Sequence, residues 1–236
     1  MCFYNSQSKR AMALAKRYGR KTDILEMVQE IIDEQYKVTA FANPDCAIVT
    51  PDSELQVAKW GLIPRWTKTW EEAAKIRKMT LNARSETIFS LPSFRTSIKT
   101  SRCLIPSTGY FEFHHEGKEA IPYYIFLKSE DLFSLGGVYD EWQNPATKEM
   151  MTTFSVITVQ ANELCAKIHN GGKNPGRMPL IISRDKEEQW LDACLKLPGV
   201  NDFLRPFNSV MMDAYPISKD FLKKGAKDAS VIEQAA

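Results

Sequence analysis

The sequence has little cysteine, little histidine and almost no net charge. Its 236 residues include three histidines, carry a formal net charge of +2 and contain no C-x-x-C pair. The five cysteines are widely spaced, at Cys2, Cys46, Cys103, Cys165 and Cys194. An odd number of isolated cysteines argues against a disulfide framework or a structural zinc site and favours a reducing compartment. We therefore expect no metal, and we expect the last four cysteines to be small core residues.

Long apolar runs, glycine-rich phosphate loops and internal repeats are also missing. Lys9 and Arg10 interrupt the N-terminal segment before the apolar region of a signal peptide could form. We expect no nucleotide cofactor, no membrane association and a cytoplasmic location. The small net charge neither requires nor excludes nucleic acid, because a local basic face can lie within a balanced total.

The hydrophobic pattern predicts a single α+β domain over residues 1–222, followed by a loose polar tail at residues 223–236. Helix-like spacing runs through residues 7–36, with Gly19 as a break. Strand-like segments follow, with scattered helices. We expect further helices at residues 70–79 and 186–195, a hairpin of 47–49 and 55–58 around the turn 50–53, strands at 102–113, 123–127, 132–138, 153–159 and 209–214, and a loop at 170–176.

Cys2 is the first candidate for chemistry. If the initiator Met1 is removed, as is usual before a small residue, Cys2 carries an α-amine and a thiol on adjacent carbons. Their pKa values are about 8 and about 8.5, so both groups are partly reactive near neutral pH. The amine can condense with an aldehyde to a Schiff base, and the thiol can then close a five-membered thiazolidine. The position of Cys2 alone favours a residue that merely follows the start codon and has no chemical role. The motifs described below favour the reactive role instead.

A carboxylate within an aromatic strand is the second candidate. In Tyr110-Phe111-Glu112-Phe113, strand alternation puts the two phenylalanines on one face and Tyr110 with Glu112 on the other. Burial among aromatic rings would raise the pKa of Glu112 into the range useful for proton transfer. If this face meets water, Glu112 is an ordinary surface residue, and the tetrapeptide alone does not decide between the two.

Two further segments carry polar groups suited to a site. Asn82 offers a donor and an acceptor, and Arg84 can hold a phosphate, although the same pattern fits a helix cap and a surface arginine. His169 follows an apolar run and precedes the predicted loop. That position is typical of a general acid or base, and also of a helix-capping residue.

A tryptophan with neighbouring cations lies near the segment 59–66. Trp60 is expected in the core. Trp66 can stack a nucleobase while Arg65 and Lys68 contact phosphates, or it can be a structural anchor.

Five motifs, in order, closely resemble one family. They are Cys2 directly after Met1, W-G-[LY]-x-P at 60–64, N-A-R-x-E at 82–86, R-C-x-x-P-x-x-G-[YW]-F-E-[FW] at 102–113 and H…R-M-P at 169–179. The chain thus resembles the SRAP-domain family, the SOS response-associated peptidases. The resemblance spans most of the chain. It implies one α+β domain with a β-barrel-like mixed-sheet core and peripheral helices.

The resemblance also implies an activity. Family members capture abasic sites in single-stranded DNA through a thiazolidine crosslink that protects the lesion during the DNA damage response. By resemblance, Cys2 is the nucleophile and Asn82 positions its amine. Glu112 shuttles protons, and His169 assists sugar ring opening and crosslink reversal.

Binding residues and partners follow from the same resemblance. Arg84 and Arg177 match family positions that hold DNA phosphates. The family name implies (auto)peptidase activity that exposes the N-terminal cysteine, and the crosslinking chemistry has lyase-like character. The expected partner is single-stranded DNA containing abasic sites. The expected protein is a cytoplasmic monomer that is nucleoid-associated when bound to DNA and needs no metal or cofactor.

The chain departs from the family pattern in three places. It begins Met1-Cys2-Phe3-Tyr4 where M-C-G-R is common, and Phe3 and Tyr4 can instead stack on the lesion strand. The usual Y-N-x-A-P segment has no clean match around residues 39–44. Residues 170–176 separate His169 from Arg177, whereas the family motif is compact.

Two other functions are compatible with the same residues. A thiol peptidase or amidohydrolase would use Cys2, Asn82 and His169 on an amide and would not need Trp66 or the arginines. A non-catalytic single-stranded DNA-binding domain would bind intact and abasic DNA equally. The mass of the protein before and after incubation with abasic single-stranded DNA distinguishes these functions.

Overall fold

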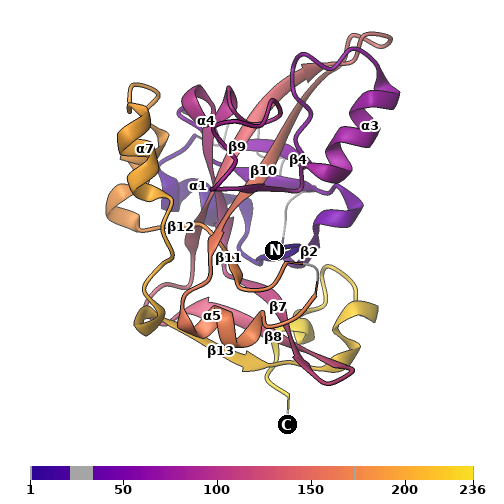
Figure 1. Ribbon diagram of the computed structural model, residues 1–236, viewed down its shortest axis with the longest axis vertical. Helices are drawn as coiled ribbons and strands as arrows, with labels where there is room; N and C mark the ends of the chain where they lie inside the picture. The colour runs from indigo at the N-terminus through magenta and orange to yellow at the C-terminus, as the bar shows by residue number, and fades with distance from the viewer. Residues whose placement is uncertain (1, 22–33, 173, 236) are drawn as a thin grey trace.

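The computed structural model describes residues 2–21, 34–172 and 174–235, and its strands form two sheets (Figure 1). The smaller sheet has the strand order β13-β8-β7-β1-β2, and the larger has the order β12-β9-β10-β4-β3, with β5 and β11 also paired to β10 and β6 to β9. The strands are β1 (Tyr4–Gln7), β2 (Gln35–Thr39), β3 (Asp45–Ile48), β4 (Gln56–Trp60), β5 (Asn82–Arg84), β6 (Arg102–Ser107), β7 (Gly109–Glu116), β8 (Glu119–Leu127), β9 (Phe133–Gln143), β10 (Met150–Gln160), β11 (Arg177–Pro179), β12 (Ile181–Ile182) and β13 (Met212–Pro216).

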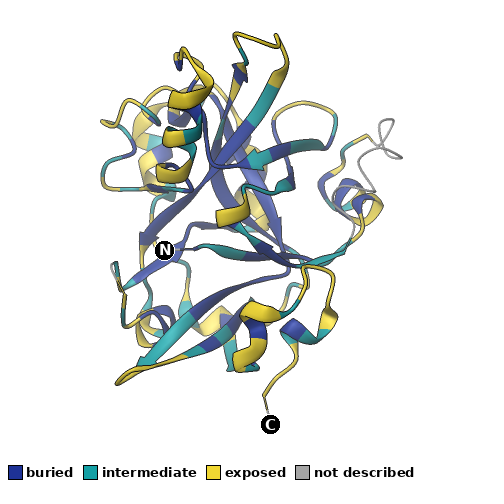
Figure 2. Cartoon of the chain, turned by 90° about the vertical axis from the view of Figure 1, so that its right-hand side faces the viewer, coloured by how far each residue is buried: buried dark blue, intermediate teal, exposed yellow. Residues whose placement is uncertain are grey.

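Short helices surround the sheets, and Figure 2 shows that buried residues concentrate in the strands while the helices carry most of the exposed ones. The α-helices are α1 (Ala11–Tyr18), α3 (Trp70–Met79), α4 (Ser97–Thr100), α5 (Glu163–Ile168), α6 (Glu187–Leu191) and α7 (Leu197–Phe203). The 3-10 helices are η1 (Ala40–Ala42), η2 (Arg184–Lys186), η3 (Ser209–Met211), η4 (Lys219–Lys223) and η5 (Ala229–Ile232). None of the helices in the described ranges is long and apolar enough to cross a membrane.

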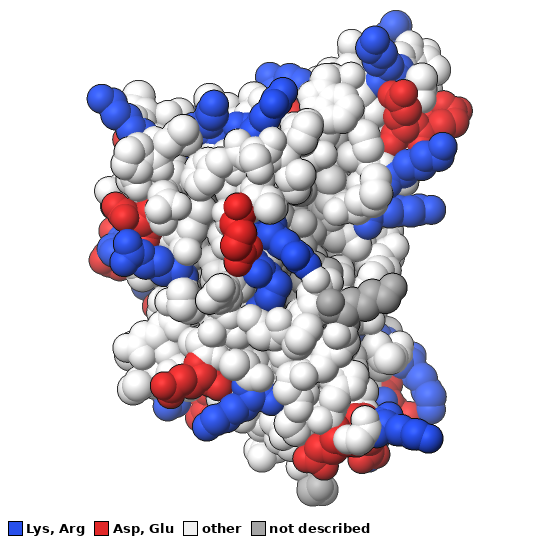
Figure 3. Space-filling model, viewed as in Figure 1, with Lys and Arg blue, Asp and Glu red and all other residues white. Residues whose placement is uncertain are grey.

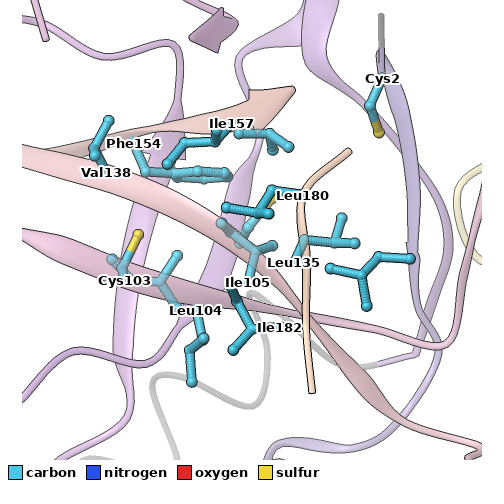
Figure 4. Packing of buried hydrophobic residues seen from close by; sticks show 14 of the residues in the cluster. Cys2, Cys103, Leu104, Ile105, Leu135, Val138, Phe154, Ile157, Leu180 and Ile182 are labelled. Carbon is cyan, nitrogen blue, oxygen red and sulfur yellow. The ribbon is translucent and has the colours of Figure 1, made fainter. Parts of the chain in front are cut away.

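The predicted α+β class with a sheet-dominated core and peripheral helices is confirmed. The larger sheet curls, so that Val49, just after β3, exchanges two backbone hydrogen bonds with Leu104 of β6, at 2.8 and 2.9 Å. The strands nevertheless do not form a closed barrel. Buried side chains of β6, β9, β10 and β12 fill the main core (Figure 4).

Several local predictions are confirmed. The hairpin around residues 50–53 is β3 and β4, which pair antiparallel from Asp45 with Lys59 to Ile48 with Gln56. The predicted helix at residues 70–79 is α3, whose first turn is capped by the Thr69 side chain accepting from the backbone N–H of Glu72. The predicted break at Gly19 is the left-handed C-cap of α1, at φ 60°.

The continuous helical pattern expected over residues 7–36 is wrong at both ends. Gln7 closes β1, and Gln35 opens β2, because both strands pair with each other at the edge of the smaller sheet. Only α1 is helical within the described part of this stretch, and residues 22–33 lie outside the described residues.

The strand expected over residues 102–113 is in fact two strands in different sheets. The chain leaves β6 at Ser107 and enters β7 at Gly109. The ring of Tyr124 lies over Gly109, where a Cβ atom would come within 2.3 Å of it. The Tyr124 hydroxyl donates to the carbonyl of Thr108 at 2.7 Å. Glycine therefore permits the close approach that fixes the switch between sheets.

Three expectations near the C-terminus are also wrong. The helix predicted over 186–195 is shorter, and Cys194 is exposed rather than a core residue, whereas Cys46, Cys103 and Cys165 are buried as expected. The tail is not loose, because Val231 is buried and the Tyr215 hydroxyl donates to the carbonyl of Ile232 at 2.6 Å. The domain boundary at residue 222 stays a prediction.

Candidate active site

The pairing of β1 with β7 places the start of the chain. Tyr4 is opposite Phe111, and the chain before Tyr4 continues beside the residues after Phe111, since the strands are antiparallel. The backbone carbonyl of Phe3 accepts from the N–H of Ala40 at 2.9 Å. Cys2 is fully buried, and its Sγ lies 3.8 Å from the carbonyl of Tyr4. Cys2 belongs to the main core cluster, and Figure 4 shows it at one edge of the residues drawn there.

The structure brings Glu112 and His169 together. Both are buried, and His169 Nε2 lies 4.0 Å from Glu112 Oε2. His169 follows the last residue of α5, as the sequence predicted. Its Nδ1 lies 2.9 Å from the carbonyl of Arg177, which can only accept a hydrogen bond. The Arg177 N–H also lies 3.3 Å from Nδ1, but the shorter contact with the carbonyl favours a proton on Nδ1, which leaves Nε2 as the acceptor nitrogen facing Glu112.

Burial shifts the pKa values of these groups toward their neutral forms. It raises the pKa of Glu112 to about 7 and lowers that of His169. It also raises the pKa of the Cys2 thiol well above its usual range, and the nearby Glu112 carboxylate adds to this effect. A carboxyl group that is half protonated near pH 7, beside a neutral imidazole, can give and take protons at neutral pH.

A pocket of about 380 Å³ opens onto this pair. Its lining residues come from the chain start, η1, β7 and the loop after α5, namely Phe3, Phe41, Glu112, Phe113, His115, His169, Gly171, Gly172 and Asn174. Phe41 is 61% exposed, and its ring centroid lies 4.8 Å from that of Phe3. Sequence reasoning missed Phe41, and the signal available was the poor match to the family motif at residues 39–44.

Phe3 and Tyr4, which the sequence suggested could both stack on DNA, lie in different surroundings. Phe3 lines the pocket. The Tyr4 ring does not, and it contacts two rings that do, Phe41 and Phe113, at centroid distances of 6.1 and 6.0 Å, as well as Phe221 at 5.3 Å. Phe111 and Phe113 belong to the same small aromatic cluster, while Tyr110 lies in the main core. The predicted alternation along β7 is thus confirmed, and Phe3 is the better placed of the two for stacking.

Asn82 lies on β5, opposite Val156 of β10. Neither Nδ2 nor Oδ1 of its amide, both shielded from solvent, has a hydrogen-bond partner within the described ranges. A buried amide without partners is costly and marks a place where a bound group would be stabilised. Asn82 and Cys2 are not among the lining residues of the pocket, and the predicted role of Asn82 stays a prediction.

The two arginines predicted to hold phosphates line an adjoining pocket of about 320 Å³, which shares Asn174 with the first. Arg84 is exposed, and its Nη2 donates to Oδ1 of Asn174. Arg177 is buried and forms a two-point ion pair with Glu86. Phosphate contact by either arginine stays a prediction.

The remaining predicted DNA contacts lie in the loop after β4. Trp66 is 52% exposed, whereas Trp60 is buried as expected. Arg65 donates through Nε to Asp140 at 2.8 Å, and Lys68 is exposed. None of these three predicted contacts lines either described pocket. Their contact with DNA stays a prediction.

A metal site is not evident around these side chains. Within residues 2–21, 34–172 and 174–235, no group of three or more His, Cys, Asp and Glu side chains could hold a metal ion. The expectation that no metal or cofactor is needed stays a prediction.

The fold and the motifs around this site define a family. The family model described as SOS response associated peptidase (SRAP) matches residues 1–223. The chain belongs to this SRAP family.

Particular relatives carry the comparison further. The abasic site processing protein YoqW of Bacillus subtilis is 35% identical over 169 residues, which cover 71% of this chain and 70% of that protein. The abasic site processing protein HMCES of Gallus gallus is 31% identical over 154 residues, 57% of this chain and 44% of that protein.

Solved structures agree with the fold. The crystal structure of a protein from Bacteroides thetaiotaomicron matches over the whole of both chains, with a TM-score of 0.96 and 48% identity. A protein from Bordetella bronchiseptica matches 92% of this chain and 100% of its own, with a TM-score of 0.77. At 23% identity, that second likeness shows the fold alone.

Proposed function

We propose that this chain captures abasic sites in single-stranded DNA covalently, through Cys2 after removal of Met1. Membership of the SRAP family and relatives named abasic site processing proteins support an abasic-site function. The observation that carries the mechanism is the position of Cys2 at the chain start, close to a buried Glu112 whose pKa is about 7.

The chemistry forms two bonds on one carbon. The ring-opened abasic sugar presents an aldehyde at C1′. The α-amine of Cys2 attacks this carbon, and loss of one water molecule leaves a C=N bond. The thiol then adds to the same carbon, so that a C–S bond forms and the thiol proton ends on nitrogen. The product is a thiazolidine, and no oxidant or reductant is needed.

Glu112 and His169 supply the proton transfers. Schiff-base formation requires a proton to leave the amine and another to reach the departing oxygen. Glu112 exists in both forms near pH 7, and His169 Nε2 is 4.0 Å from it. One group can therefore accept a proton while the other delivers one. Opening of the sugar ring requires the same exchange between the C1′ hydroxyl and the ring oxygen.

The DNA strand would be held on both sides of this pocket. Phe3 and Phe41 form an exposed aromatic surface on which a base next to the lesion can stack. Arg84, in the adjoining pocket, supplies a cation for a phosphate. Trp66, Arg65 and Lys68 are candidates for more distant contacts. The monomeric state and the cytoplasmic, nucleoid-associated location are parts of the same proposal.

Peptidase activity, in this proposal, acts on the chain's own N-terminus to expose Cys2. A general thiol peptidase or amidohydrolase would instead turn over external amides. A simple DNA-binding domain would form no covalent adduct.

The test is the mass of the purified protein before and after incubation with abasic single-stranded DNA. We expect a starting mass that lacks Met1, and a heat-stable adduct whose mass is that of protein plus oligonucleotide minus one water. Cys2→Ala should abolish the adduct and retain much of the noncovalent binding, since phosphate contacts provide affinity. A normal adduct band for Cys2→Ala on a denaturing gel would refute the mechanism.

A further inference from the structure

The guanidinium of Arg177 is almost fully occupied by contacts within the protein. Nη1 and Nη2 each donate to one carboxylate oxygen of Glu86 at 2.9 Å. Nε donates to Oγ1 of Thr158 at 3.3 Å, and Nη2 also donates to the Thr158 carbonyl at 2.7 Å. These four hydrogen bonds use all but one of the five N–H groups of a guanidinium. The Arg177 side chain is 10% exposed and that of Glu86 44%.

This ion pair crosses the sheet between the two segments that carry the candidate site. β5 lies parallel to β10, with Arg84 opposite Thr158. Glu86 follows in the turn after β5, where Ser85 N–H also donates to the Thr158 carbonyl at 2.9 Å. β11 pairs antiparallel with the same strand, with Arg177 opposite Gln160. The contact therefore joins the ends of two strands across β10.

The backbone of Arg177 continues the connection to His169. Its carbonyl accepts from His169 Nδ1 at 2.9 Å, and its N–H lies 3.3 Å from the same nitrogen. One residue thus binds Glu86 through its side chain and orients the His169 ring through its backbone. Figure 3, in the view of Figure 1, shows acidic and basic side chains in contact near the middle of this face, in the region of β11.

We propose that Glu86 is a positioning residue, which with Arg177 holds the Asn82 strand and the His169 loop in their reactive arrangement. Removing the carboxylate would leave a largely buried cation without its counterion, which is costly, so the segment would rearrange. The activity readout of this proposal rests on the proposed function, whereas the structural readout does not.

A phosphate-binding role of Arg177 predicts the opposite outcome. If Arg177 must release Glu86 to hold a DNA phosphate, the Glu86 carboxylate competes with DNA. Neutralising Glu86 would then strengthen DNA binding and leave crosslinking unchanged or faster. Under the positioning role, neutralising Glu86 leaves binding nearly unchanged and slows the chemistry.

The first experiment compares Glu86→Gln with Glu149→Gln, an exposed carboxylate where β10 begins. Single-turnover crosslinking is measured over a range of abasic-DNA concentrations. We expect Glu86→Gln to lower the rate constant by about 10- to 100-fold, since small misplacements of reacting groups have effects of this size. The half-saturating DNA concentration should stay within about twofold of wild type, and Glu149→Gln should match wild type in both values. Tighter DNA binding with an unchanged rate constant overturns the proposal.

A second variant separates charge from geometry. Arg177→Lys keeps the positive charge and loses the planar fork that binds both carboxylate oxygens. We expect it to slow crosslinking as Glu86→Gln does, with DNA affinity retained. If Arg177→Lys crosslinks with the wild-type rate constant, the two-point contact between Arg177 and Glu86 does not position the reacting groups.

The last readout does not depend on crosslinking. The imidazole NMR signals of His169 should shift in Glu86→Gln, whereas those of His114, whose Nδ1 lies 2.8 Å from the Lys167 carbonyl, should stay in place. An unchanged His169 signal overturns the positioning role. If wild-type protein forms no adduct, the proposed function fails, and this measurement still tests the contact.

Discussion

Replacing Glu112 with glutamine should separate binding from chemistry. Glu112 is 6% exposed, has a pKa of about 7 and lies 4.0 Å from His169 Nε2. Glutamine keeps the shape and most hydrogen-bonding capacity of this side chain but cannot exchange a proton. Loss of a general acid or base typically slows a reaction by about 10²–10⁴-fold. We expect a loss of that size in the crosslinking rate constant and little change in the initial affinity for DNA.

The pH dependence gives a sharper form of the same prediction. The protonated carboxyl group is lost as pH rises past about 7, whereas the free α-amine increases toward pH 8. The wild-type rate should therefore pass through a maximum between these values. In Glu112→Gln there is no carboxyl group to ionise, so the rate should not fall at high pH. It should stay below that of wild type and increase with pH until the amine is fully unprotonated.

In Glu112→Gln the free energy of unfolding should rise, although the crosslinking rate constant falls. The Glu112 pKa is raised from 4.5 to about 7, so the folded protein binds more protons than the unfolded chain between these values, and stability falls as pH rises through this window. At 1.36 kcal/mol per pKa unit, the buried carboxylate costs about 3 kcal/mol above pH 7. Glu112→Gln should raise the free energy of unfolding by up to about that amount at pH 8, with a much smaller gain at pH 4.

The assay is a quenched time course at saturating abasic single-stranded DNA, with products separated on denaturing gels from pH 5 to 9. Glu116→Gln is the matched control, because Glu116 ends the same strand with an exposed side chain. A wild-type rate constant and pH maximum in Glu112→Gln would remove Glu112 from the reaction. Equal losses in both variants would point to a general electrostatic effect.

Three further outcomes are expected. Cys2→Ser should form a Schiff base that borohydride traps but an adduct less durable than that of wild type, and an equally durable adduct would contradict ring closure by sulfur. Noncovalent affinity, measured with Cys2→Ala, should fall with salt with a logarithmic slope of about −2 if Arg65, Lys68 and Arg84 each contact one phosphate, and a flat response would count against DNA binding. Phe41→Ala should weaken binding by about 1–3 kcal/mol if a base stacks on this ring. The fluorescence of a 2-aminopurine base next to the lesion should be quenched by wild-type protein and not by this variant. Equal quenching by both proteins would show that the base does not stack on Phe41.

Local patterns in the sequence predicted those parts of the structure that local forces determine. Alternation along β7 put Tyr110 in the main core and Phe111 and Phe113 in the smaller aromatic cluster, because strand geometry alone fixes the facing of side chains. The turn signal at residues 50–53 likewise predicted the hairpin of β3 and β4. The place of His169 at the end of a helix followed from an apolar run that meets a glycine-containing loop.

Contacts between distant segments were beyond such patterns. Gln7 has helix-compatible neighbours, yet it lies in β1 because β2 and β7 offer backbone partners far along the chain. The meeting of Glu86 with Arg177 depends on β5 and β11 both pairing with β10. Phe41, in η1, likewise lines the pocket together with segments that lie far from it in the sequence. Local patterns carry no information about pairing between strands that lie far apart in the sequence.

Burial of Cys2 bears on the order in which its two nucleophiles would react. The thiol is fully buried, and its pKa lies far above that of a free cysteine, so almost no thiolate is present near pH 7. An α-amine with a pKa of about 8 is about one-tenth unprotonated at that pH. The amine is therefore the better first nucleophile, and Schiff-base formation brings the carbon next to the thiol. Glu112, having released its proton to the departing oxygen, is then an acceptor for the thiol proton. The same burial that keeps the thiol inert before DNA arrives thus favours its use as the second nucleophile rather than the first.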